Sequence, residues 1–163
     1  MSKLNKLAAL ALVLNLLGYI PKIGHLFSLA GFILGIFVYR ELESLGLISN
    51  AWKKFMAITL LSLIAVVLAV IGYLSHNITI SIIFSILAYA TGLLTAWITY
   101  LLSREVMATA INTQEKSFKI AAVLLKISAF TMPVLIGFLI QGLAQLVFLI
   151  AAIIYKPNQA IED

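Results

Sequence analysis

The sequence predicts an all-α fold, a polytopic transmembrane helix bundle of six spans in which two short hairpins flank a longer central pair. Three observations support this prediction. Of the 163 residues, 63% are hydrophobic and only 10% are charged, and the mean hydropathy is +1.14, whereas a soluble domain is nearer half apolar and a quarter charged. The apolar runs are separated by short turns, and nearly all basic residues fall into alternate turns. We therefore expect one transmembrane domain over 1–163, in the cell membrane.

The first hairpin is expected over 4–42. Its two spans are Leu4–Ile20 and Gly24–Tyr39, and Pro21 and Gly24 interrupt the helix between them. Proline cannot continue a helix, and glycine accepts backbone angles that other residues avoid. Both spans are near the lower limit of ~17 residues for crossing a bilayer.

The central pair is expected over 51–102, with spans Ala51–Leu74 and Ile78–Leu102. Both have the ~20 or more residues that a hydrocarbon core of ~30 Å requires. The segment Glu105–Ile111 is expected to extend the second of these helices beyond the membrane. Ser49 with Asn50 is expected to cap the helix that follows.

The last hairpin is expected over 118–155, with spans Phe118–Val134 and Gly137–Tyr155. A single helix over 119–156 would be ~55 Å long, almost twice the hydrocarbon thickness. Asn112 with Glu115 resembles a capping box for the first of these helices. The remaining residues, 156–163, are expected to form a short cytoplasmic tail.

Charge placement predicts that both termini are cytoplasmic. With six spans, nine of the eleven basic residues lie on the side of the termini, Lys22 alone lies on the other side, and Lys126 lies inside a span. Short cytoplasmic loops carry such an excess, so the net charge of +5 does not indicate nucleic-acid binding. Aromatic residues are expected at the inner boundary (Tyr39, Trp52, Tyr100, Tyr155) and at the outer one (Tyr19, Tyr73).

Small side chains recur at spacings of three and four residues, which places them on one face of each helix. One interpretation of these faces is close helix packing within the chain. The functional alternative is that the face of the fourth span lines a polar path or docks a helix of a partner subunit. The candidate residues are Gly24, Ser28, Gly31 and Gly35 in the second span, and Ser81, Ser85, Gly92 and Thr95 in the fourth. Asn15, Gln141 and Gln145 are expected to form hydrogen bonds between helices.

Lys126 and two histidines are the remaining candidates. Lys126 either extends its side chain to the inner headgroups or contacts a lipid or ligand, because a charge inside a membrane is costly. His25 and His76 are both expected near the outer surface. They are interfacial residues or, in the alternative, axial ligands of a haem iron.

No catalytic constellation is visible. The chain has no cysteine, no pair of carboxylates inside a predicted span and no glycine-rich phosphate loop after a strand. We therefore expect no enzymatic activity, no metal site and no resident cofactor apart from the haem alternative.

The first hairpin resembles a known group of proteins. The stretch 17–24, LGYIPKIG, followed by LAGFILG over 29–35 and YREL over 39–42, resembles an uncharacterised, largely archaeal family of small prokaryotic integral membrane proteins. The resemblance implies a prokaryotic host.

The leading functional hypothesis is a non-catalytic accessory subunit of a larger membrane complex, such as a respiratory or other energy-converting one. Its expected partners are membrane lipids and other integral membrane subunits. One alternative is a small oligomeric channel or transporter that uses the Ser/Thr face of the fourth span and Lys126. The other is a haem-binding electron carrier through His25 and His76.

Overall fold

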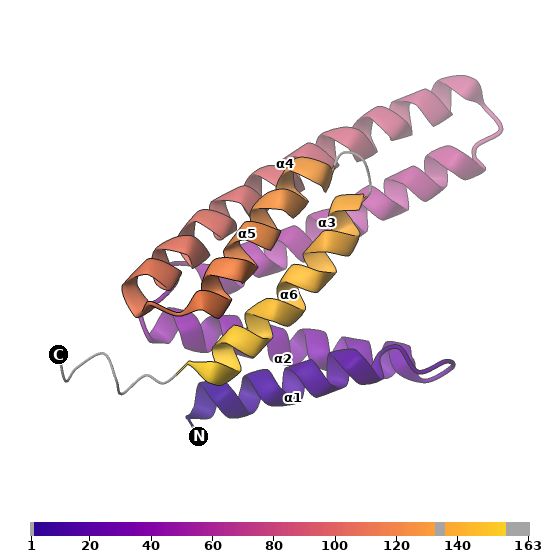
Figure 1. Cartoon of the computed structure of the whole chain (residues 1–163). Coiled ribbons are helices and arrows are strands. Elements are labelled where there is room, and N and C mark those ends of the chain that lie inside the picture. Colours follow the sequence, from indigo (N-terminus) through magenta and orange to yellow (C-terminus); the bar gives the residue numbers. More distant parts are fainter. Residues whose placement is uncertain (1, 133–135, 156–163) are drawn as a thin grey trace.

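A computed structural model describes residues 2–132 and 136–155, and within them the chain forms helices and no strand. The order of the elements is shown in Figure 1. The helices are α1 (Lys3–Leu17), α2 (Gly24–Ser44), α3 (Ala51–Leu74), α4 (Ile78–Thr113), α5 (Lys116–Thr131) and α6 (Ile136–Ile154). These six correspond one to one to the predicted segments, and α3 has the predicted bounds. The expected tail, 156–163, lies outside the described residues, as does the middle of the last predicted turn.

Two helices begin with side-chain caps. The Ser2 side chain accepts a hydrogen bond from the Asn5 N–H, and the Asn5 side chain accepts one from the Ser2 N–H, which is a capping box for α1. The Asn77 side chain accepts bonds from the N–H groups of Thr79 and Ile80, 2.9 and 3.3 Å away, at the start of α4.

The two caps predicted from the sequence are wrong. Asn50 precedes α3 with φ of 50°, a left-handed conformation, and its side chain makes no capping bond. Glu115 precedes α5, also without a capping bond, after a left-handed Gln114. Asn50 and Gln114 therefore form sharp turns between helices, where polar residues tolerate the left-handed region, and Asn112 lies inside α4.

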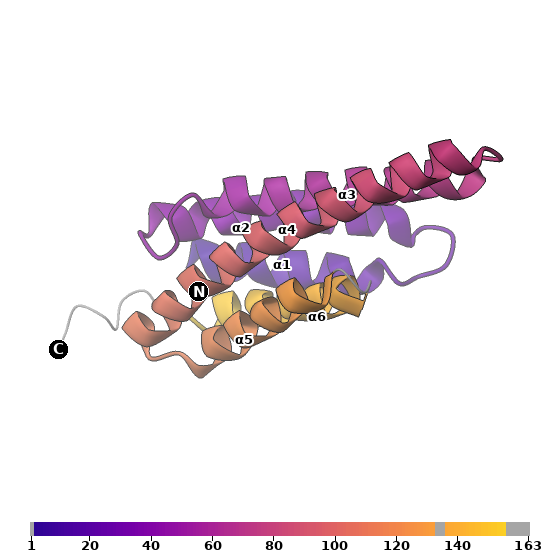
Figure 2. The ribbon, with the colours of Figure 1, turned by 90° about the horizontal axis from the view of Figure 1, so that it is seen from above.

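The α3–α4 hairpin projects beyond the rest of the bundle (Figures 1 and 2). α4 has 36 residues, which corresponds to a length of about 54 Å. Its final turns continue past the predicted span to Thr113, as expected from the sequence, and there Val106 and Ala110 are buried.

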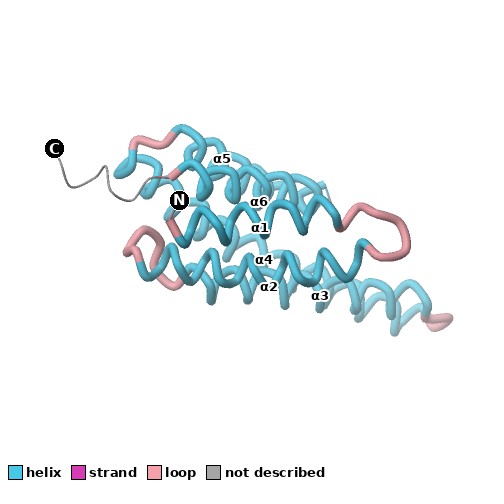
Figure 3. The backbone as a smooth tube through the Cα atoms, turned by 90° about the horizontal axis from the view of Figure 1, so that it is seen from below, coloured by secondary structure: helices cyan, strands magenta, loops and turns pink. Residues whose placement is uncertain are grey.

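The bundle has one tightly packed end. The N-terminus, the end of α6 and the turns at 45–50 and 114–115 lie at this end, and the turns at 18–23 and 75–77 lie at the other (Figures 1 and 3). Most fully buried side chains belong to the packed end; they include Leu4, Ala8, Val38, Leu42, Ile48, Ala51, Leu102, Val106, Phe118, Ala152 and Tyr155. The opposite end exposes apolar side chains such as Tyr73 and Ile78.

The two outer hairpins touch each other through α1 and α6. The Asn5 amide nitrogen donates to the backbone carbonyls of Ala152 and Tyr155, 3.3 and 2.9 Å away, and also to that of Ile153. These carbonyls lie at the C-terminal end of α6, where a helix leaves acceptors without an internal partner. One buried side chain thus joins the two ends of the chain.

Two helices are long and apolar enough to cross a membrane, namely α3 and α4. Only 17% of the apolar stretch of α3 and 11% of that of α4 is buried, unlike the core helix of a soluble protein. α1 and α5 are shorter than predicted, with 15 and 16 residues.

Candidate functional site

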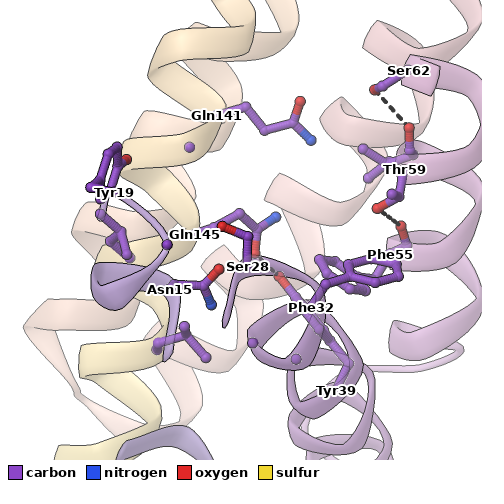
Figure 4. A pocket seen from close by; sticks show the side chains of 17 residues that line it. Asn15, Tyr19, Ser28, Phe32, Tyr39, Phe55, Thr59, Ser62, Gln141 and Gln145 are labelled. Atoms are coloured by element: carbon purple, nitrogen blue, oxygen red, sulfur yellow. Dashed lines mark hydrogen bonds between the residues drawn. The ribbon is translucent and has the colours of Figure 1, made fainter. Parts of the chain in front are cut away.

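A cleft opens between the first hairpin, α3 and α6. Its volume is about 460 Å³, and Figure 4 shows its polar side chains. The lining residues come from α1 and the turn after it (Asn15, Gly18, Tyr19), α2 (Ser28, Gly31, Phe32, Gly35, Tyr39), α3 (Phe55, Ile58, Thr59, Ser62) and α6 (Gln141, Gly142, Gln145, Leu146, Leu149). No described residue of this lining is acidic, basic or a histidine. A neutral polar cleft is therefore enclosed by largely apolar helices.

Tyr39 forms the floor of the cleft. Its ring stacks between Phe55 and Phe148, with centroid distances of 4.5 and 4.7 Å. Its hydroxyl donates a hydrogen bond of 2.6 Å to the Gln145 side-chain oxygen. With 1% of its surface exposed, Tyr39 belongs to the core and does not face outward from the bundle, and its predicted level at the inner membrane boundary stays a prediction. Tyr155, which is 7% exposed, is likewise buried.

The Gln145 amide nitrogen is buried and has no hydrogen-bond partner among the described residues. Such a donor is costly to leave unpaired, by about 1–3 kcal/mol. In Figure 4 the amides of Gln141 and Gln145 point from α6 across the cleft, toward α3. The wall of the cleft therefore contains a buried donor for which the described residues supply no acceptor.

Three other polar side chains of the cleft are bonded within their own helices. Asn15 donates to the Ala11 carbonyl at 2.8 Å, so its predicted bond between helices is not formed. Thr59 and Ser62 donate to the carbonyls of Phe55 and Ile58, at 3.0 and 2.7 Å. A hydroxyl that donates in this way keeps lone pairs free to accept. Gln145 alone makes the bond between helices that the sequence predicted, to Tyr39 of α2.

A second hollow lies along the projecting part of the α3–α4 hairpin. Its volume is about 650 Å³, and Met132 closes one side of it. We call this hollow the hairpin groove; its small lining residues are Ala65 and Ala69 of α3 and Ser81, Ser85, Ala88 and Gly92 of α4. A Cβ atom added at Gly92 would meet no atom within 4 Å. At Gly92 the groove is therefore open, whereas nearer the turn a Cβ atom on Gly72 would lie 3.4 Å from the Ser81 carbonyl oxygen, so α3 and α4 approach closely there.

The small residues of α2 instead face α1. A Cβ atom on Gly24 would lie 2.0 Å from the Gly18 carbonyl oxygen, and one on Gly31 would lie 2.9 Å from the Asn15 amide nitrogen. The Ser28 hydroxyl likewise occupies the space that a Cβ atom on Gly18 would need. Gly35 is buried in the wall of the cleft, beside Phe55. Gly24, Ser28 and Gly31 thus pack the first hairpin against itself, while Ser28, Gly31 and Gly35 line the cleft.

The polar face predicted for the fourth span is divided between two environments. Ser81, Ser85 and Gly92 line the hairpin groove, whereas Thr95 and Thr99 are fully buried. Thr95 and Thr99 donate to the carbonyls of Thr91 and Thr95, four residues earlier, at 2.9 Å each. The face therefore forms no continuous polar path in the described chain.

Lys126 is exposed on α5 and lines neither the cleft nor the hairpin groove. His76 is exposed in the turn between α3 and α4, and the side chain of His25 lies outside the described part of the structure. The turn before α2 and the turn after α3 lie apart at the loosely packed end (Figure 1). The fold does not bring the two histidine-bearing segments together, and the described residues contain no cluster that could hold a metal ion.

Comparison of the chain with protein-family models, with curated proteins and with solved structures finds no match. The resemblance of the first hairpin to an archaeal membrane family stays a prediction.

Proposed function

We propose that the chain spans the membrane six times, with both termini in the cytoplasm. The support is the charge asymmetry together with the exposed apolar surface of α3 and α4. The ion pairs Lys3–Glu41, at 2.7 Å, and Lys54–Glu105 both lie at the packed end, the end that this topology places in the cytoplasm.

The chain has no cysteine, so single cysteines report the topology directly. Ser75→Cys, in the turn after α3, should react with a membrane-impermeant maleimide on intact cells. Ser44→Cys, at the end of α2, should react only after the membrane is opened. Labelling of Ser44→Cys from outside would refute the proposed orientation.

Within the membrane, the protein acts as a non-catalytic accessory subunit of a larger complex. The hairpin groove supports this proposal, because there two apolar helices project beyond their own bundle and leave small side chains uncovered. Membrane helices associate through such small residues because these let the backbones approach closely. The occupant that fits is a transmembrane helix of another subunit, which would pack its larger side chains over Gly92 and Ser85.

The test is native mass spectrometry of the protein extracted gently from its own membranes. Gly92→Leu fills the groove without a clash inside the chain, because a Cβ atom there meets open space. Ala90→Leu is the matched control, since Ala90 is an exposed residue of the same helix that does not line the groove.

We expect a foreign subunit at fixed stoichiometry with the wild type and with Ala90→Leu, and its loss from Gly92→Leu. Wild-type protein that leaves the membrane alone, or only as a homo-oligomer, would refute the accessory function. A visible spectrum of the same sample tests the haem hypothesis, which requires a Soret band that disappears when His25 or His76 is replaced.

A further inference from the structure

The cleft above Tyr39 has features that helix packing does not explain. The stacked Tyr39 lies at one end of it, and Tyr19, which is 80% exposed, belongs to its lining at the other. In the proposed topology the Tyr19 end lies toward the outer side of the membrane. Because the buried Tyr39 stack fills the other end, the cleft is suited to binding and not to conduction.

The chemistry of the wall defines the class of ligand. The described lining carries amides and hydroxyls but no ionised group, so it provides nothing to neutralise a charged ligand in a desolvated site. The buried Gln145 nitrogen has no acceptor among the described residues, while Thr59 and Ser62 donate to their own helix and keep lone pairs that can accept. A ligand hydroxyl matches both kinds of group, because it donates one hydrogen bond and accepts others.

An aromatic wall lies beside these polar groups. Phe32 and Phe55 have ring centroids 5.4 Å apart, and Phe55 continues onto the Tyr39 ring. Such a surface suits the apolar C–H face of a ring or short carbon chain whose oxygens point toward α6. Neutral polar groups on one side and aromatic rings on the other together fit a small ligand with several hydroxyls.

We propose that this cleft binds a neutral, multiply hydroxylated group, a sugar or polyol. The group is either a free molecule from the outer aqueous phase or the headgroup of a glycolipid in the outer leaflet. This site is separate from the hairpin groove, and the proposal does not depend on the accessory function.

Gly142 offers a way to block the cleft without disturbing the fold. It lines the cleft, and a Cβ atom there would meet no atom within 4 Å. Gly142→Leu should therefore occupy the ligand's volume. Gly92→Leu is the matched control, because it adds the same side chain to the hairpin groove and leaves the cleft unchanged. Gln141→Leu removes an amide of the cleft without breaking the bond between Tyr39 and Gln145.

The experiment places the full chain, purified in a sugar-free detergent, in phosphatidylcholine nanodiscs. Binding of monoglucosyl diacylglycerol is measured by native mass spectrometry, and binding of methyl glucoside by saturation-transfer NMR. Phosphatidylglycerol serves as the anionic comparison. Thermal unfolding by circular dichroism verifies that every variant is folded.

We expect the wild type and Gly92→Leu to bind the neutral probe, Gly142→Leu to lose binding, and Gln141→Leu to bind about five- to tenfold more weakly, as for one lost hydrogen bond. Binding of methyl glucoside assigns the site to a free sugar or polyol, and binding of the glycolipid alone assigns it to a headgroup. The proposal is overturned if the wild type binds neither probe, if Gly142→Leu binds as the wild type does, or if phosphatidylglycerol binds as tightly as the glycolipid.

Discussion

Gly24→Ala should destabilise the protein more than any other single methyl addition to the first hairpin. A Cβ atom at Gly24 lies 2.0 Å from the Gly18 oxygen and 2.7 Å from the Gly18 carbonyl carbon. Ordinary contact begins at 3.4 Å, so the two backbone segments must separate by about 1.4 Å, at the junction where α1 turns into α2. Both clashing atoms belong to the backbone and cannot rotate away as a side chain would.

The expected cost follows from the usual cost of overpacking, which is about 1–3 kcal/mol. Replacing glycine by alanine inside a helix returns up to about 1 kcal/mol, but Gly24 is the first residue of α2, so this gain is small here. We expect a net loss of about 2 kcal/mol, which corresponds to a Tm lower by about 4–8 °C for a chain of this size.

Gly142→Ala is the matched control, because its Cβ atom enters open space within α6. It should leave the Tm unchanged or raise it slightly through the higher helix propensity of alanine. The assay is thermal unfolding of both variants by circular dichroism in one detergent. Equal Tm values for the two variants would refute the close approach of α1 and α2 at the turn.

Three further predictions concern the packed end and the cleft floor. Asn5→Ala should lower the free energy of unfolding by about 1–3 kcal/mol, because the α6 carbonyls that accept from Asn5 are left unpaired. Amide hydrogen exchange should become faster in α1 and in the last turn of α6, and unchanged exchange would contradict this prediction. Tyr39→Phe keeps the aromatic stack and loses only the 2.6 Å bond to Gln145, so we expect a loss of about 1 kcal/mol, measured as a Tm shift. Glu105→Gln should destabilise the folded protein more than Glu41→Gln, since the Lys54 side chain is 19% exposed and the Lys3 side chain 74%. We expect Glu41→Gln to cost less than about 1 kcal/mol, and an effect as large as that of Glu105→Gln would contradict this order.

The helices themselves could be predicted from the sequence. Their number, the start of α3 at Ala51, the start of α4 at Ile78 and the extension of α4 all follow from local features, namely the length of the apolar runs and the Pro, Gly and Asn residues between them. The caps expected at Asn50 and at Asn112 with Glu115 are absent, because polar residues serve equally well in a left-handed turn, as Asn50 and Gln114 do here.

The candidate site could be predicted only in part. Gly31, Gly35 and Gln145 were recognisable as small or polar residues inside apolar spans, but Tyr39 had the position of an interfacial aromatic and is instead the floor of the cleft. Gly142 gave no signal, because no small residue lies three or four positions from it to form a face of small side chains.

Local features of the sequence account for the apolar helices, the short turns and the basic residues in alternate turns. Tertiary packing, in contrast, brings α1 against α6 and Tyr39 to Gln145, and leaves the α3–α4 hairpin projecting. The sequence does not specify these contacts, because the helices are apolar around most of their circumference and no amphipathic face fixes which side turns inward. Close packing and a few buried hydrogen bonds make that choice, and they join residues as distant in sequence as Asn5 and Tyr155.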